Sequence, residues 1–155
     1  MNISELLSPE RVAIQSKGAT SELNKSAAIG LLSSLLARGV RLPESDVESV
    51  LSEREALQST GIGDGVAIPH GALAEIAGPC AALLLVPAGL DFEAIDDAKV
   101  TILFAVIGPK KATGEHLKTL AKISRLLKNP SFRDRLLAAQ TGNAAFDMIL
   151  AEEAR

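Results

Sequence analysis

The chain has 155 residues and is poor in the residue types on which several classes of function depend. It holds one cysteine, no tryptophan and no tyrosine, and aromatic side chains make up 3% of it. The single cysteine, Cys80, excludes an internal disulfide and a cysteine-rich zinc site, and we expect it to be a buried, unreactive thiol. Scarce aromatic side chains argue against stacking on bases, so we expect no nucleic-acid partner.

Long apolar runs are also missing. The longest, residues 81–86 and 102–107, are far shorter than the roughly 20 residues that a membrane-spanning helix needs. The opening residues are acidic and polar where a secretory signal would be basic and then apolar. We therefore expect a cytoplasmic protein without membrane insertion.

What the chain does have is aliphatic side chains in two kinds of pattern. Hydrophobic residues make up 47% of the sequence, enough for the core of one domain over residues 1–155. Helical spacing and end signals predict helices over residues 24–38, from 43 onward, 114–128, from 130 onward and 143–153. Apolar runs predict buried strands over residues 66–68, 81–86 and 100–107. Strands interleaved with helices predict an α/β (α+β) layer fold.

Several helix ends have recognisable signals. Gly39 is predicted to stop the first long helix, and Pro43 to lie in the first turn of the next. Asn129 is predicted to cap a helix that begins at Pro130. Thr113 is a possible cap for the helix that contains His116.

Charge is unevenly distributed along the chain, although the net charge is only −3. Residues 41–99 hold 11 acidic and 3 basic side chains, whereas residues 110–135 hold 8 basic and 2 acidic ones. Two readings stay open: two electrostatically distinct faces, one of which meets a charged partner, or the solvated sides of amphipathic helices. The second is the more common pattern.

His70 stands at the end of an apolar strand, in the segment Val66-Ala-Ile-Pro-His-Gly71. Pro69 restrains the backbone before it, and Gly71 leaves room beside it for an approaching group. Because an imidazole has an unperturbed pKa of about 6.5, neutral His70 is a nucleophile that needs no separate base. The pattern is compatible with phosphoryl transfer, although a lone histidine at a strand end is more often structural or on the surface.

His116 is the chain's second histidine, and it lies in the first turn of a predicted helix. The positive end of the helix dipole disfavours the imidazolium there and favours a bound anion. A second imidazole at such a place could donate a hydrogen bond to a transferring phosphoryl group.

Other kinds of site have little support. Two histidines and one cysteine make a poor zinc ligand set, and the glycines at positions 61, 63 and 65 do not form a G-x-G-x-x-G or P-loop pattern. No serine has the G-x-S-x-G setting of a hydrolase.

The segment SEREALQSTGIGDGVAIPHG, residues 52–71, resembles the active-site segment of enzyme IIA proteins of the phosphoenolpyruvate:sugar phosphotransferase system. The resemblance is to the fructose/mannitol type and above all to its nitrogen-regulatory branch. Residues 90–105 resemble the loop and strand that follow the active site, and residues 115–124 the helix with the second histidine. Residues 3–12 resemble the opening of the nitrogen-branch proteins.

This resemblance implies a mixed β-sheet flanked by helices and a phosphoryl transfer without metal or organic cofactor. It implies that His70 is phosphorylated by a carrier of the HPr type or its nitrogen-branch counterpart (NPr). It further implies that His116 stabilises the phosphoryl group and that Arg54 lies near the active site.

Arg54 and Thr60 each have a second interpretation. Arg54 either stabilises charge in the site or forms a surface ion pair with Glu53 or Glu55. Thr60 either donates its hydroxyl to the site or caps the turn that follows, and the turn is favoured. Ala72 departs from the lysine or other polar residue that many relatives have after His-Gly, which puts the choice of donor in doubt.

We predict a regulatory phosphocarrier of the nitrogen branch, a component of the phosphotransferase system whose partners are its donor and either regulatory target proteins or a IIB domain. One alternative is a sugar-specific IIA subunit that passes the phosphoryl group to a IIB domain for fructose or mannitol. The other is a regulatory binding module that keeps the fold without transfer.

Overall fold

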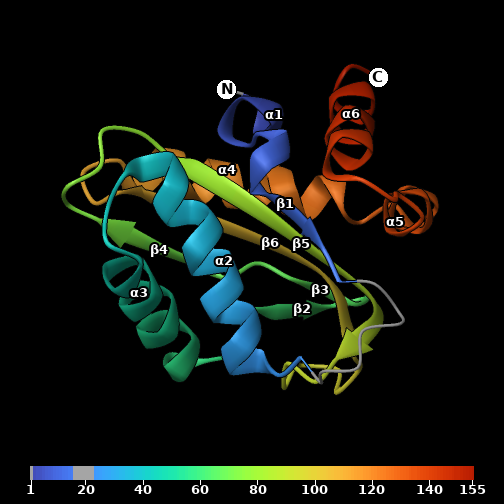
Figure 1. Cartoon of the computed structure of the whole chain (residues 1–155), viewed down its shortest axis with the longest axis horizontal. Coiled ribbons are helices and arrows are strands. Elements are labelled where there is room, and N and C mark those ends of the chain that lie inside the picture. The colour runs from blue at the N-terminus through green and yellow to red at the C-terminus, as the bar shows by residue number, and fades with distance from the viewer. Residues whose placement is uncertain (1, 16–22) are drawn as a thin grey trace.

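A computed structural model describes residues 2–15 and 23–155. Figure 1 shows the arrangement of its helices and strands. The helical elements are α1 (Ile3–Leu6), a 3₁₀ turn (Pro9–Arg11), α2 (Lys25–Val40), α3 (Glu44–Leu57), α4 (Thr113–Leu126), α5 (Pro130–Leu137) and α6 (Gly142–Glu153). The strands are β1 (Val12–Ile14), β2 (Gly61–Gly63), β3 (Val66–Ala67), β4 (His70–Leu73), β5 (Cys80–Leu90) and β6 (Val100–Pro109).

The strands of the described residues form one mixed sheet in the order β1-β5-β6-β3-β2, with β4 also paired to β6. The long central strands β5 and β6 are antiparallel, whereas β1 pairs with β5, and β3 and β4 pair with β6, in parallel. This confirms the mixed sheet flanked by helices that the sequence resemblance implies.

Helices cover both faces of the sheet, and each face has its own apolar core. In Figure 1, α2 and α3 lie in front of the sheet and α4 lies behind it. Leu84 of β5 and Leu103 of β6 belong to the core under α2 and α3. Leu83 and Phe104 belong to the core under the opposite helices. Alternate residues of β5 and β6 therefore point to opposite cores, as the pleat of a strand requires, and both strands are predominantly apolar because both faces are covered.

Most predicted helices are confirmed, with corrections at their ends. Gly39 does not stop its helix, because α2 continues to Val40 and ends at Arg41 in the left-handed conformation (φ 58°). Pro43 lies at the N-cap position and not inside the first turn of α3. Asn129 caps α5 as predicted: its side-chain oxygen accepts hydrogen bonds from the amides of Ser131 and Phe132.

A tight hairpin and a proline shape the edge of the sheet that holds His70. Asp64 and Gly65 connect β2 to β3 and both have positive φ, which is the backbone of a type I′ turn. Pro69 then separates β3 from β4, although both strands pair with β6. Since proline has no N–H to donate, it interrupts the ladder at this point.

None of the helices in the described part of the chain is long and apolar enough to cross a membrane.

Candidate active site

His70 begins β4 and points to the side of the sheet that α4 covers. It pairs with Val106 of β6, whose side chain belongs to the core under α4. Gly71, the next residue, faces α3 instead, because a Cβ added there would collide with Val50. Ala72 returns to the side of His70, pairs with Gly108 and is half-buried.

The structure brings the two histidines together, although 45 residues separate them in the sequence. Their ring centroids are 5.8 Å apart and the ring planes are tilted by 51°. His116 comes from α4, whose N-cap is Ala112 and not Thr113, so the possible Thr113 cap is wrong. Thr113 is the first helical residue, and its hydroxyl donates to the carbonyl of Lys110 at 3.4 Å.

Gly108 lets the ring of His116 lie against β6. A Cβ at position 108 would come within 2.7 Å of His116 Nδ1, closer than side chains tolerate. Sequence spacing does not single out this glycine, since the contact forms only when α4 packs on β6. We note it as a residue of the site that the sequence interpretation missed.

The hydrogen bond of His70 assigns the tautomer of its ring. Nδ1 lies 2.6 Å from the carbonyl oxygen of Ile68. Because a carbonyl only accepts, Nδ1 must carry the proton, and we assign the tautomer on that basis. The lone pair of the neutral ring is therefore on Nε2.

The surroundings of His116 assign its proton to the other ring nitrogen, Nε2. Its Nδ1 is buried and has no hydrogen-bond partner among the described residues. Since an unpaired buried N–H is rarer than an unpaired acceptor, we assign the proton to Nε2. Nδ1 is the ring atom nearest Gly108, so the Nε2–H lies on the side of the ring away from the sheet.

Both imidazoles are held in the neutral form. Burial lowers the pKa of His70, and the Arg54 charge acts in the same direction, against the Ile68 hydrogen bond and the Glu55 charge. Burial also lowers the pKa of His116, and the charge of His70 adds to this effect. Near pH 7 the site therefore has one nucleophilic nitrogen and one N–H donor.

Arg54 lies within electrostatic reach of His70, since its charge lowers the pKa of that ring. Its guanidinium Nη1 donates to the carbonyl of Gln58 at 2.8 Å, at the end of α3. Among the described residues it forms no ion pair with Glu53 or Glu55; Glu55 pairs with Lys25 instead.

Thr60 and Glu55 form a buried pair next to the site. The Thr60 hydroxyl donates to Glu55 Oε2 at 2.5 Å, and the Thr60 amide donates to Oε1 at 3.0 Å. Thr60 is 4% exposed, and its hydroxyl bonds Glu55 and not His70. The sequence interpretation considered Glu55 only as a surface partner of Arg54; its place on the helix face that packs inward was the signal available.

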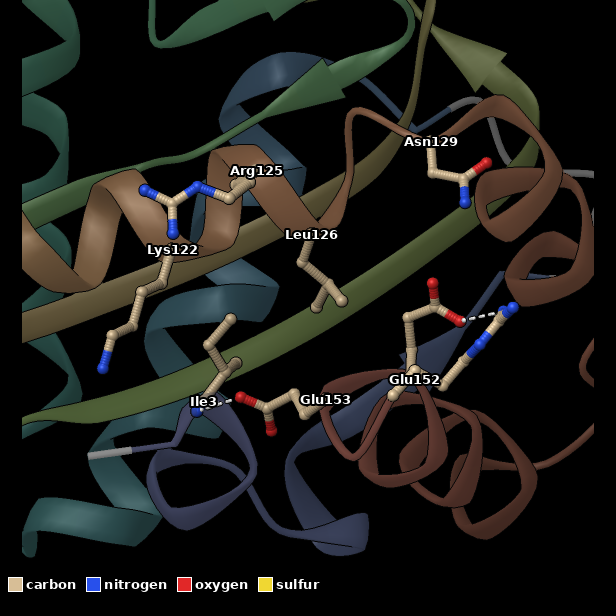
Figure 2. A pocket seen from close by; sticks show the side chains of 8 residues that line it. Ile3, Lys122, Arg125, Leu126, Asn129, Glu152 and Glu153 are labelled. Carbon is tan, nitrogen blue, oxygen red and sulfur yellow. Dashed lines mark hydrogen bonds and ion pairs between the residues drawn. The ribbon is translucent and has the colours of Figure 1, made fainter.

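A separate groove lies between α1, α4 and α6 (Figure 2) and has a volume of about 510 Å³. It contains neither histidine. Glu153 accepts from the amides of Ile3 and Ser4, and Glu152 pairs with Arg155 at 3.3 Å. Glu153 thus joins the two ends of the described chain.

Metal ligands are not clustered in the described part of the chain, where no group of three His, Cys, Asp or Glu side chains could hold an ion. Cys80 is buried as predicted, and burial raises the pKa of its thiol.

Comparison with known proteins identifies the family of the chain. Residues 5–152 match the family described as "Phosphoenolpyruvate-dependent sugar phosphotransferase system, EIIA 2". The chain is 35% identical to a "Nitrogen regulatory protein" of Pseudomonas aeruginosa, over 97% of this chain and 96% of that one. It is 32% identical to a "PTS system fructose-specific EIIA component" of Haloferax volcanii, over 96% and 94% of the two chains.

The crystal structure of nitrogen regulatory protein IIA-Ntr from Neisseria meningitidis superimposes with a TM-score of 0.85. The two are 30% identical, over 95% of this chain and 98% of that chain. A family match over nearly the whole length, with the same fold, leaves one assignment: the chain belongs to the EIIA type 2 family of the phosphoenolpyruvate-dependent sugar phosphotransferase system.

Proposed function

We propose that the protein is a phosphocarrier that accepts a phosphoryl group on Nε2 of His70 from a phosphorylated carrier of the HPr or NPr type. The observation that carries this proposal is the 2.6 Å hydrogen bond between His70 Nδ1 and the Ile68 carbonyl, which leaves the lone pair on Nε2. We further propose that it acts in the cytoplasm as one domain of the nitrogen-regulatory branch, because its relatives include nitrogen regulatory proteins.

The transfer requires no proton removal at the nucleophile. The Nε2 lone pair attacks phosphorus, a phosphorus–nitrogen bond forms, and the bond from phosphorus to the donor breaks with its electron pair leaving on the donor. Nδ1–H stays on the Ile68 carbonyl throughout. A neutral ring suits this step, and burial keeps His70 neutral by lowering its pKa.

Charge on the transferring group would be stabilised by His116 and Arg54. The His116 ring is 5.8 Å from that of His70, and its Nε2–H is available to donate to a phosphoryl oxygen. Arg54 would have to release the Gln58 carbonyl to reach the group. Positioned donors of this kind supply most of the catalysis in phosphoryl transfer.

Reconstitution tests the proposal. The protein is incubated with phosphoenolpyruvate, enzyme I and an HPr-type carrier, and its mass is measured. We expect a gain of one acid-labile phosphoryl group in the wild type and none in His70→Ala. Replacing His116 by Ala should slow the gain by about a hundredfold without moving the site, a typical effect of losing one charge-stabilising donor. A phosphoryl group gained by His70→Ala would show that another residue is phosphorylated. A wild type that gains none would favour the alternative of a regulatory binding module without transfer.

A sugar-specific role is the second candidate, because one relative is a fructose-specific EIIA component. Adding IIB domains of fructose and mannitol type to the phosphorylated protein separates the two. Rapid onward transfer to a IIB cysteine would favour sugar uptake, and retention of the phosphoryl group on His70 would favour regulation.

A further inference from the structure

Beneath His70 lies a buried polar cluster that the transfer step itself does not use. Glu55 of α3 is 9% exposed, and its carboxylate accepts from the Thr60 amide and hydroxyl. Its Oε1 also lies 2.8 Å from Lys25 Nζ, at the start of α2. Lys25, Glu55, Thr60 and the peptide of Ile68 are here called the Glu55 network.

A buried carboxylate is costly unless it is fully paired, so its partners are fixed closely in place. Lys25 also lies 4.8 Å from the ring centre of Phe92, which restricts the ammonium from a second side. The network thus joins the first residue of α2, the last turn of α3 and the segment that leads to the hairpin. It occupies fixed positions before any phosphoryl donor arrives.

Hydrogen bonds continue from this network to the reactive ring. The Ile68 amide donates to the Thr60 carbonyl at 3.0 Å. The Ile68 carbonyl in turn accepts from His70 Nδ1 at 2.6 Å. The path therefore runs from Glu55 through the backbone of Thr60 and of Ile68 to His70, and it fixes the position of each group along it.

Pro69 lies between the two residues that form the last bond of this path. Because proline interrupts the ladder between β3 and β4, His70 lies just beyond the break and Ile68 just before it. The backbone of Ile68 is held by Thr60 at its amide and by His70 at its carbonyl. A shift of Thr60 would move the carbonyl that selects the tautomer of His70.

We propose, on the basis of the function proposed above, that Glu55 and Thr60 are positioning residues for phosphoryl acceptance, acting through the backbone of Ile68 to hold His70 in the Nδ1–H tautomer with Nε2 free. Glu55 touches neither the ring nor the phosphoryl group. Its effect reaches the ring through the hydrogen-bonded path and through its charge.

The charges that face His70 come from α3 and α4. Arg54 and Glu55 act from α3 with opposite signs, and His116 acts from α4; the Glu55 charge raises the pKa of His70. Removing that charge, or loosening the Ile68 hydrogen bond, should therefore lower the pKa of His70. A lower pKa leaves more neutral ring, so slower transfer in such a variant cannot come from protonation.

The test compares Glu55→Gln and Thr60→Val, which keep the shape of each side chain, with Glu53→Gln as a control. Glu53 is exposed on the same helix, so this control removes the same charge outside the network. Imidazole ¹⁵N shifts report the tautomer and pKa of His70, and reconstitution with the HPr-type carrier reports the rate. Thermal unfolding reports whether each variant is folded.

We expect the wild-type ring to be mainly the Nδ1–H tautomer. Both network variants should gain Nε2–H tautomer, titrate at lower pH and accept the phosphoryl group about tenfold more slowly at saturating donor, since small misplacements of a reacting group have effects of this size or larger. Thr60→Ser, which restores the hydroxyl, should restore tautomer and rate. Glu53→Gln should match the wild type.

Two results would overturn the proposal. One is a wild-type ring that is mainly the Nε2–H tautomer, a measurement that needs no variant. The other is an unchanged tautomer and titration in folded Thr60→Val, which would leave the network a purely structural role. If Glu55→Gln does not fold, the pair Thr60→Val and Thr60→Ser decides. Failure of the wild type to accept phosphoryl would count against the proposed function, while the ¹⁵N measurement would still decide the network.

Discussion

The two histidines of the site both turn Nδ1 toward the protein, but among the described residues Nδ1 meets a hydrogen-bond acceptor in His70 and none in His116. His70 turns Nδ1 toward a backbone carbonyl, and His116 turns Nδ1 toward Gly108. The same side chain therefore presents a lone pair in one case and an N–H in the other. In the proposed transfer, one ring attacks phosphorus while its neighbour donates to the phosphoryl oxygens.

The pH dependence of acceptance follows from the state of His70. Because burial lowers its pKa below the ordinary 6.5, the neutral, nucleophilic form predominates above that lowered value. We expect the rate to be flat near pH 7 and above, and to fall in acid with a midpoint below 6.5. Rates are measured with a constant supply of phosphorylated carrier, and a midpoint above 6.5 would contradict the assignment.

Sequence predicted both histidines as site residues, but it did not predict the packing contacts around them. Apolar residues, a proline and a glycine around His70 mark a restrained position, and they lie next to it in the chain. Gly108, Lys25 and the inward place of Glu55 depend on packing between elements distant in sequence. Thr60 was singled out, but its bond to Glu55 was not foreseen.

The close packing of α4 on β6 determines the position of His116. A variant that adds one methyl group at Gly108 tests whether this position matters. In Gly108→Ala the added Cβ would lie 2.7 Å from Nδ1 of His116, so the ring must move. We expect phosphoryl acceptance to slow by about tenfold or more, as for other small displacements of a catalytic group. Reconstitution rates and thermal unfolding are the measurements.

Gly78→Ala is the matched control for that variant. A Cβ added at Gly78 would meet nothing within 4 Å, and we expect wild-type rate and stability. Equal rates in the two variants would show that the contact between Gly108 and His116 has no part in catalysis.

Long elements were predicted better than short ones. The helices α2, α4 and α6 and the strands β5 and β6 have enough residues for their periodicity or apolar run to be recognised. Strands β1 and β2 have three residues each, too few for a pattern, and they form because β5 and β3 supply partners. Gly39 failed as a stop signal because α2 accommodates it and ends two residues later at Arg41.

Stability of the whole molecule should depend on pH through the two histidines. Both have a lower pKa in the folded protein than the ordinary 6.5, so the unfolded chain binds more protons in this range. The free energy of unfolding is then highest above pH 6.5 and falls as pH decreases through that value toward the folded pKa values. Chemical denaturation at about pH 7.5 and 5.5, above the range where carboxylates titrate, measures the difference.

The double variant His70→Gln, His116→Gln is the comparison for this effect. It should lose most of the change in unfolding free energy between those two pH values, because its pH-dependent groups in this range are gone. Two results would show that the histidines are not the cause. One is a wild type whose free energy of unfolding is the same at both pH values. The other is a double variant whose free energy of unfolding falls as much as that of the wild type between them.

Charge in the folded molecule follows the layers. Helix α3 begins with Glu44 and Asp46, whereas Lys118, Lys122 and Arg125 are exposed on α4 across the sheet. The basic side chains of α4 lie on the exposed side of that helix, as the solvated-face reading predicts.

The sequence by itself determined the long helices and strands, the layered fold class and the two candidate histidines, because these depend on local periodicity and on residue chemistry. Only the tertiary structure decided that β3 and β4 share one edge of β6, that α4 brings His116 beside His70, and that Glu55 is buried against Thr60. Those contacts join segments far apart in the chain, and their geometry arises when the sheet and its two helical layers pack together.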